Sequence, residues 1–122
     1  CVSARAKNIS PILLVAPNTS NDRIKKISEM AGDLIYAVSI LGVTGNNITS
    51  KIDLKRYLKR VRENSSTPFI VGFGISSRKD VCWFNQYSDG AVVGSAIINK
   101  INKTTDPIKI IKNLIKELKG TK

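Results

Sequence analysis

A short apolar run is joined to a predicted helix by the decapeptide Val71-Gly72-Phe73-Gly74-Ile75-Ser76-Ser77-Arg78-Lys79-Asp80. Gly72 and Gly74 lack a Cβ, so a ligand can approach the backbone closely at this junction. Ser77 and Asp80 have the spacing of a capping box, which predicts that a helix begins here. A helix start offers unpaired N–H groups and the positive end of a dipole. The stretch therefore indicates an anion site, most often a phosphate site.

A shorter copy of this pattern lies nearer the C-terminus. There, an apolar run over residues 91–93 leads directly into Gly94 and Ser95, where a short helix is expected to begin. We expect the rest of the chain to hold the two turns side by side, so that both contact one anion.

Composition restricts the class of protein. The 122 residues are 42% hydrophobic and contain no apolar stretch long enough to span a membrane, which predicts one soluble unit without a membrane partner. The net charge of +11 raises the question of nucleic acid. The lysines, however, are spread over the outer faces of all the predicted helices without interleaved aromatic residues. A solvated basic surface is therefore preferred to nucleic-acid binding.

The cysteines and histidines exclude further chemistry. Cys1 and Cys82 are the two cysteines, and their spacing fits neither a metal site nor a redox motif, so no metal is expected. Cys82 lies in an apolar helical pattern and is interpreted as a small core residue. Histidine, the commonest general base, is absent. Residues 1–8 resemble the end of a helix, so we expect the sequence to be a piece of a longer protein.

Four strand-helix units follow one another along the chain. Strands are predicted at residues 12–16, 34–39, 69–71 and 90–93. The first is a continuous apolar run, which predicts a strand covered on both faces. The helices between and after the strands show apolar stripes at helical spacing. The stripes consist of Ile24, Ile27, Met30 and Ala31; Leu54, Tyr57, Leu58 and Val61; Val81 and Phe84, with Cys82 and Tyr87 beside them; and Ile108, Ile111, Leu114, Ile115 and Leu118.

This alternation predicts an α/β fold with a parallel sheet. Four units can form a small open sheet or half of an eight-unit barrel. Barrel enzymes often bind phosphate with the loops after strands seven and eight and with an extra short helix. The two glycine turns and the helix after Gly94 fit that rule. We therefore expect the second half, strands 5–8, of a (β/α)8 TIM barrel, with residues 1–122 as the C-terminal half of one domain and the N-terminal half absent.

The acidic residues of this chain do not lie where a catalytic residue is expected. Barrel catalysts come from strand ends, and none of the nine acids ends a predicted strand. Four of them lie at helix starts, where capping and the helix dipole explain them: Asp22, Asp53, Asp80 and Asp106. The chain is thus expected to hold a phosphorylated substrate without transforming it.

Four motifs resemble the C-terminal half of the tryptophan synthase alpha chain family, in order and spacing, across residues 9–118. They are Leu34-Ile35-Tyr36-Ala37-Val38-Ser39, Gly42-Val43-Thr44-Gly45, Gly72-Phe73-Gly74-Ile75-Ser76 and Val93-Gly94-Ser95-Ala96-Ile97. The resemblance implies a barrel of the ribulose-phosphate-binding type and a lyase of tryptophan biosynthesis, which cleaves indole-3-glycerol phosphate to indole and glyceraldehyde 3-phosphate. It also implies a beta chain partner in an alpha2-beta2 tetramer. Pyridoxal phosphate would belong to that partner, so no cofactor is expected here.

The resemblance also implies roles for individual residues. Backbone N–H groups of Gly74, Gly94 and Ser95 would bind the phosphate, with Phe73 beside the substrate. Tyr36 would form a wall of the active site. The loop with Gly42, Thr44 and Gly45 would close over the substrate, and Thr44 would help to position a catalytic aspartate. The family's catalytic glutamate and aspartate belong to its N-terminal half and have no counterpart here, so the chain alone is expected to be inactive.

The sequence departs from the family pattern at two places and allows two alternative functions. Asn46-Asn47 replaces a basic residue common after the loop, and Arg78 replaces a proline common at the helix start. One alternative is a phosphate-ligand-binding half-barrel that self-associates without catalysis, since half a barrel has two unpaired edges. The other is a basic nucleic-acid binder. The cytoplasm or a plastid stroma is the expected location.

Overall fold

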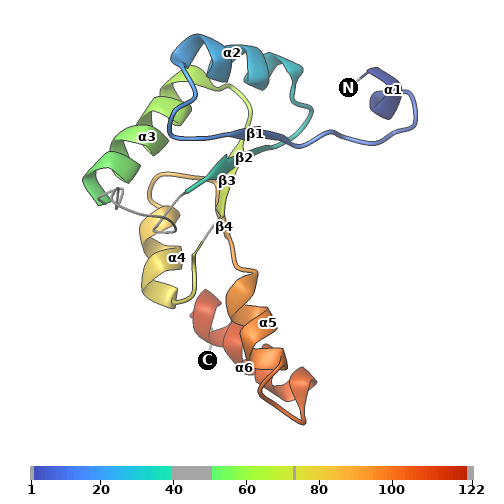
Figure 1. The fold of residues 1–122 in the computed structure, drawn as a ribbon, viewed down its shortest axis with the longest axis vertical. Helices are drawn as coiled ribbons and strands as arrows, with labels where there is room; N and C mark the ends of the chain where they lie inside the picture. The colour runs from blue at the N-terminus through green and yellow to red at the C-terminus, as the bar shows by residue number, and fades with distance from the viewer. Residues whose placement is uncertain (1, 40–50, 73, 121–122) are drawn as a thin grey trace.

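The computed structural model describes residues 2–39, 51–72 and 74–120. Along the chain, strands and helices alternate, as Figure 1 shows. The elements are α1 (Val2–Arg5), β1 (Leu13–Val15), α2 (Asn21–Met30), β2 (Ile35–Val38), α3 (Lys51–Asn64), β3 (Phe69–Gly72), α4 (Arg78–Phe84), β4 (Gly90–Val92), α5 (Ser95–Ile101) and α6 (Pro107–Lys119).

The four strands form one parallel sheet in the order β1-β2-β3-β4, so that each strand pairs with its neighbours in the sequence. Helices α2, α3 and α4 lie on one side of this sheet (Figure 1). The predicted strand-helix units and the parallel sheet are therefore confirmed. Each crossover helix covers the strands that it connects, because its apolar stripe needs a surface to pack against.

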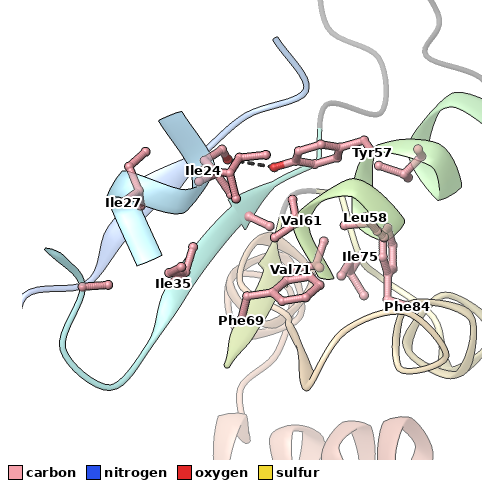
Figure 2. Packing of buried hydrophobic residues seen from close by; sticks show 14 residues of the cluster. Ile24, Ile27, Ile35, Tyr57, Leu58, Val61, Phe69, Val71, Ile75 and Phe84 are labelled. Carbon is pink, nitrogen blue, oxygen red and sulfur yellow. Dashed lines mark hydrogen bonds between the residues drawn. The ribbon is translucent and has the colours of Figure 1, made fainter. Parts of the chain in front are cut away.

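The core lies between the sheet and these helices. Strand residues that point to the helices are fully buried, among them Ile35 and Phe69, and they meet Ile24 of α2 and Leu58 of α3 (Figure 2). The Tyr57 hydroxyl donates a hydrogen bond of 2.9 Å to the Val15 carbonyl. This bond satisfies the one polar atom of a buried ring and attaches α3 to β1.

The opposite face of the sheet is not covered by described residues. Leu14 of β1 is 62% exposed, whereas its neighbour Val15 is 1% exposed. The prediction of a first strand covered on both faces is therefore wrong. The described residues supply a helical layer for only one face of the sheet.

Helix α2 begins as predicted but buries a different set of residues. Ser20 caps it by accepting a hydrogen bond from the Arg23 N–H, and Ile24 and Ile27 are buried. Met30 is 51% exposed, so its predicted place in the core is wrong. At about 100° per residue, Met30 is turned about 120° away from Ile24. Ser28 lies nearer to the direction of Ile24 and is buried instead of Met30.

The stripe of α3 is confirmed in full, since Leu54, Tyr57, Leu58 and Val61 are all buried. In α4 the outcome is mixed. Phe84 is 2% exposed, but Cys82 is exposed, and its interpretation as a core residue is wrong. The reason is helical geometry: Val81 and Phe84 share the side that faces the sheet, and Cys82 is turned about 100° from Val81.

Helix α6 begins at the predicted position. The Asp106 side chain accepts a hydrogen bond from the Lys109 N–H, and Gly120 ends the helix with φ +73°. Leu114 and Leu118 of its apolar stripe are buried, but Ile108 is 68% exposed. Thus α6, which packs against α4 and α5, covers only part of its apolar face. Within the described ranges, no helix is long and apolar enough to cross a membrane.

Candidate functional site

The two glycine turns follow adjacent strands at the same edge of the sheet. Val38, Gly72 and Val92 are aligned in one row across β2, β3 and β4. Because the strands are parallel, the turn after Gly72 and the turn after Val92 leave the sheet at the same end. The expectation that the fold places these turns side by side is confirmed by this register.

The first turn needs a glycine at one position. Gly74 has φ +70°, in the left-handed region that other residues rarely adopt. The chain then enters α4 through a complete capping box, in which the Ser77 hydroxyl accepts from the Asp80 N–H and the Asp80 carboxylate accepts from the Ser77 N–H. The predicted capping box is thus confirmed.

The capping box also changes what the turn can offer to an anion. One oxygen of Asp80 accepts hydrogen bonds from the N–H groups of Ser76 (3.3 Å) and Ser77 (3.0 Å). The expectation of unpaired N–H groups at this helix start is therefore wrong for these two residues. Burial raises the pKa of Asp80, but the hydrogen bonds from Ser77 and Ser76 and the charge of Lys51 outweigh it, so the pKa lies below its ordinary 3.8.

The second turn is open. Gly94 precedes α5 and provides no side-chain cap. A Cβ built on Gly94 would meet no atom within 4 Å among the described residues, so the space beside this backbone is free. The two turns differ accordingly. At the first turn, the Asp80 carboxylate already accepts from the backbone N–H groups. The second turn leaves room for a ligand next to Gly94 and Ser95.

Tyr36 lies on the sheet face that the helices do not cover. Its ring extends over Gly72 of the neighbouring strand, and a Cβ at Gly72 would overlap the tyrosine hydroxyl. Gly72 is two residues nearer to the carboxyl ends than the partner of Tyr36, because Tyr36 pairs with Ile70 and Val38 pairs with Gly72. The hydroxyl of Tyr36 is therefore directed towards the end of the sheet that carries the turns.

The remaining predicted site residues, Gly42, Thr44, Gly45 and Phe73, lie outside the described residues. Arg78, the departure at the start of α4, has its guanidinium group against Gly120, where a Cβ would overlap it. Among the described residues, no group of three or more His, Cys, Asp or Glu side chains could hold a metal ion.

Sequence reasoning missed a cluster of hydroxyl groups at the other end of the sheet. The Ser28 hydroxyl oxygen of α2 accepts hydrogen bonds from the N–H groups of Ser66 (3.1 Å) and Thr67 (3.2 Å), just before β3. The Ser65 hydroxyl donates to the same oxygen. A serine within the apolar face of α2 was the signal that could have revealed this cluster. The cluster secures α2 to the segment that leads into β3.

A second anchor at that end involves an ion pair. One oxygen of Asp89 accepts a hydrogen bond of 2.9 Å from the Phe69 N–H and one of 3.0 Å from the Arg62 guanidinium. The Arg62 guanidinium also lies over the Phe69 ring, 4.6 Å from its centroid. Asp89, which precedes β4, thus joins the starts of β3 and β4 to α3. Asp89 therefore serves the stability of the sheet.

Parallel strands that alternate with helices, and glycine turns at the carboxyl ends of the last two, define a protein of the α/β barrel class, of which this chain forms half. The family model for the tryptophan synthase alpha chain matches residues 1–121. The chain belongs to the tryptophan synthase alpha chain family.

Individual relatives agree with this assignment. The chain is 43% identical to the tryptophan synthase alpha chain of Petrotoga mobilis over 119 residues, which cover 94% of this chain and 46% of that protein. It is 47% identical to that of Bacillus velezensis over 102 residues, covering 84% and 38%. A chain of the tryptophan synthase a2b2 complex from Pyrococcus furiosus superposes with a TM-score of 0.81 at 32% identity, covering 96% and 48%. The chain spans less than half the length of these relatives.

Proposed function

We propose that residues 1–122 supply the substrate-holding half of a barrel that cleaves indole-3-glycerol phosphate to indole and glyceraldehyde 3-phosphate, in the biosynthesis of L-tryptophan. The observation that carries this proposal is the pairing of the two glycine turns at one edge of the sheet, with free space beside Gly94. Membership in the tryptophan synthase alpha chain family supports the reaction.

The phosphate would be bound mainly at the second turn. Backbone N–H groups of Gly94 and Ser95 are the donors that we assign, with Gly74 of the first turn completing the site. Because the Asp80 carboxylate already accepts from Ser76 and Ser77, a phosphate placed deeper into the first turn would meet a negative charge. Among the described residues, Gly94 has no such neighbour, since none of their atoms lies within 4 Å of a Cβ built there.

The carboxylates of the reaction would come from a segment outside these residues. Asp80 is held in its capping box, and Asp89 is held by Arg62 and the Phe69 N–H at the opposite end of the sheet. Asp89 lies out of reach of a substrate at the turns, and proton transfer requires hydrogen-bond reach. The Asp80 carboxylate oxygen is already engaged by the N–H groups of Ser76 and Ser77. The chain by itself is accordingly proposed to be inactive.

Further parts of the proposal concern the loop and the partner. Thr44, with Gly42 and Gly45, would close over the substrate, Phe73 would lie beside it, and Tyr36 would form a wall of the site. The beta chain of tryptophan synthase is the proposed protein partner, as in the a2b2 complex named for the Pyrococcus furiosus relative. A cytoplasmic or plastid location stays a prediction.

Complementation tests the function. The chain is combined with the N-terminal half of the Petrotoga mobilis protein, and release of indole from indole-3-glycerol phosphate is measured. We expect activity from the pair and none from either half. The Gly94→Asp variant places a carboxylate in the proposed phosphate space and should abolish activity, whereas Asn99→Asp, an exposed position of α5, adds the same charge elsewhere and should retain it.

A folded pair that releases no indole contradicts the enzymatic proposal. If such a pair still binds glyceraldehyde 3-phosphate, and Gly94→Asp abolishes that binding, the chain is a phosphate-binding module without catalysis. If wild type and Gly94→Asp bind glyceraldehyde 3-phosphate equally, the assignment of the second turn is wrong.

A further inference from the structure

An apolar cavity of about 390 Å3 lies among the last strand and the last three helices. Its walls come from α4, β4, α5 and α6, and Figure 1 shows these elements together in the C-terminal part of the chain. Small-molecule sites are typically hollows of this size, mostly apolar and with a few polar groups. Six apolar side chains line the cavity: Val81, Ala91, Val93, Ile97, Ile115 and Leu118.

The cavity leaves side chains of the helix-facing layer incompletely buried. Ala91 stands in one row of the sheet with Ala37 and Val71, and both of these are fully buried. Ala91 itself is half-buried, as is Val81 on α4, because the cavity lies against them. An apolar molecule in the cavity would remove their surface from water, which favours its binding.

The volume of the cavity indicates the size of its occupant. An engineered apolar cavity of about 150 Å3 in another protein stays dry and binds one benzene molecule. The cavity of this chain is more than twice as large, so it has room for a fused two-ring body. Cys82 and Asn85 also line it and are exposed, so the cavity is open to a ligand from solution.

Positive charge gathers at one end of the cavity. Lys119 is one of the lining residues, and the Arg78 guanidinium lies against Gly120, the next residue along the chain. Arg78 precedes Val81 by three residues on α4, which places both on the same side of that helix. Within residues 2–39, 51–72 and 74–120, neither cation is paired with a carboxylate. No acidic residue is found among the described residues that line the cavity.

The dipole of α6 balances only part of this charge. A helix C-terminus carries about half a negative elementary charge, whereas Arg78 and Lys119 together bring two positive charges. Neighbouring cations repel one another, and an anion between them relieves the repulsion. We propose that the cavity binds a small carboxylate with a two-ring apolar body. The rings lie among the apolar side chains, and the carboxylate lies at Lys119 and Arg78. The proposal does not depend on the proposed function.

Calorimetric titration with 2-naphthoate tests the site, on the 122-residue chain alone and on the pair of halves that the complementation test uses. We expect one molecule to bind per chain in both samples. The neutral 2-naphthamide has the same rings without the charge, and acetate has the charge without the rings. Each should bind about tenfold more weakly or worse. Bound 2-naphthoate should also slow the alkylation of Cys82 by iodoacetamide, because this exposed cysteine lines the cavity.

Two charge reversals on α6 locate the carboxylate. Lys119→Glu places a negative charge at the cavity and should weaken the binding of 2-naphthoate about tenfold or more. Lys116→Glu is the matched control, since Lys116 is an exposed residue of the same helix that does not belong to the described lining. It should bind like the wild type. Circular dichroism should show the same helix content in both variants.

Four results overturn the proposal: no binding by the folded wild type, equal loss of binding in the two variants, binding that leaves the alkylation of Cys82 unchanged, or binding by the chain alone that disappears in the pair. The last result would show that the added half fills the cavity. Phosphate and substrate are absent throughout, so failure here leaves the proposed function untouched.

Discussion

The hydroxyl of Tyr36 on β2 rests against the α-carbon of Gly72 on β3, in the space that a Cβ at position 72 would occupy. The contact explains why the strand ends in glycine and why a half-buried tyrosine has a defined direction. It also makes the two residues a coupled pair, because a change in the size of one alters the space for the other.

Gly72→Ala should therefore displace the Tyr36 ring. Overpacking of this kind is expected to lower the free energy of unfolding by about 1–3 kcal/mol. Tyr36→Ala removes the obstructing atoms, so Gly72→Ala should cost less in the Tyr36→Ala background than in the wild type. Urea unfolding of the four proteins measures the coupling. Strictly additive effects would show that the two residues do not share this space.

The lowered pKa of Asp80 predicts an acid-dependent loss of stability. Burial raises this pKa, but the hydrogen bonds from Ser77 and Ser76 outweigh burial and leave it below the ordinary 3.8. A carboxyl with a lowered folded-state pKa stabilises the fold fully above its unfolded pKa, and this stabilisation is lost as the pH falls through the folded value. Urea unfolding at a series of pH values should show that Asp80→Asn is less stable than wild type at neutral pH and that the gap narrows below pH 3.8. A gap that is constant with pH would contradict this assignment.

Asp89 should matter more than an ordinary ion pair. Asp89→Ala leaves the Phe69 N–H and the Arg62 guanidinium without their shared acceptor. Loss of a hydrogen-bonded partner of this kind is expected to cost about 1–3 kcal/mol. The control is Glu63→Ala, which breaks the exposed pair with Lys59 at 3.7 Å and should cost under about 0.5 kcal/mol. Thermal unfolding compares them, and equal losses would refute the anchoring role of Asp89.

The two turn glycines should respond differently to alanine. Gly74→Ala forces a Cβ into a backbone with φ +70° and should destabilise the chain by about 1–2 kcal/mol. Gly94→Ala adds a methyl group where no atom of residues 2–39, 51–72 or 74–120 lies within 4 Å, so the unfolding free energy should change by less than about 0.5 kcal/mol. Binding of inorganic phosphate, measured by calorimetry, should nevertheless weaken in Gly94→Ala. Unchanged binding would remove the second turn from the proposed site.

Local signals in the sequence predicted the elements and their ends. The pair Ser77 and Asp80, and Asp106, each cap the helix expected of them, because a cap depends on neighbours within a few residues. The parallel direction of the strands followed from their alternation with helices. At the site, the sequence located both glycine turns, since their neighbourhood depends only on parallel register.

Burial was predicted less well, because it depends on distant parts of the chain and on what covers them. Met30, Cys82 and Ile108 lie in apolar patterns, yet each is exposed. The occupation of the first turn by Asp80 was also missed. A capping box and an anion site share one sequence pattern, and only the positions of the carboxylate oxygens distinguish them.

The hydroxyl cluster around Ser28 and the Asp89 anchor both lie at the amino ends of the strands, while the glycine turns lie at the carboxyl ends. The residues that anchor the sheet are thus separate from the residues of the proposed site. Substitutions at the turns therefore leave the anchors intact, so the proposed phosphate site can change without loss of the contacts that hold the sheet to its helices.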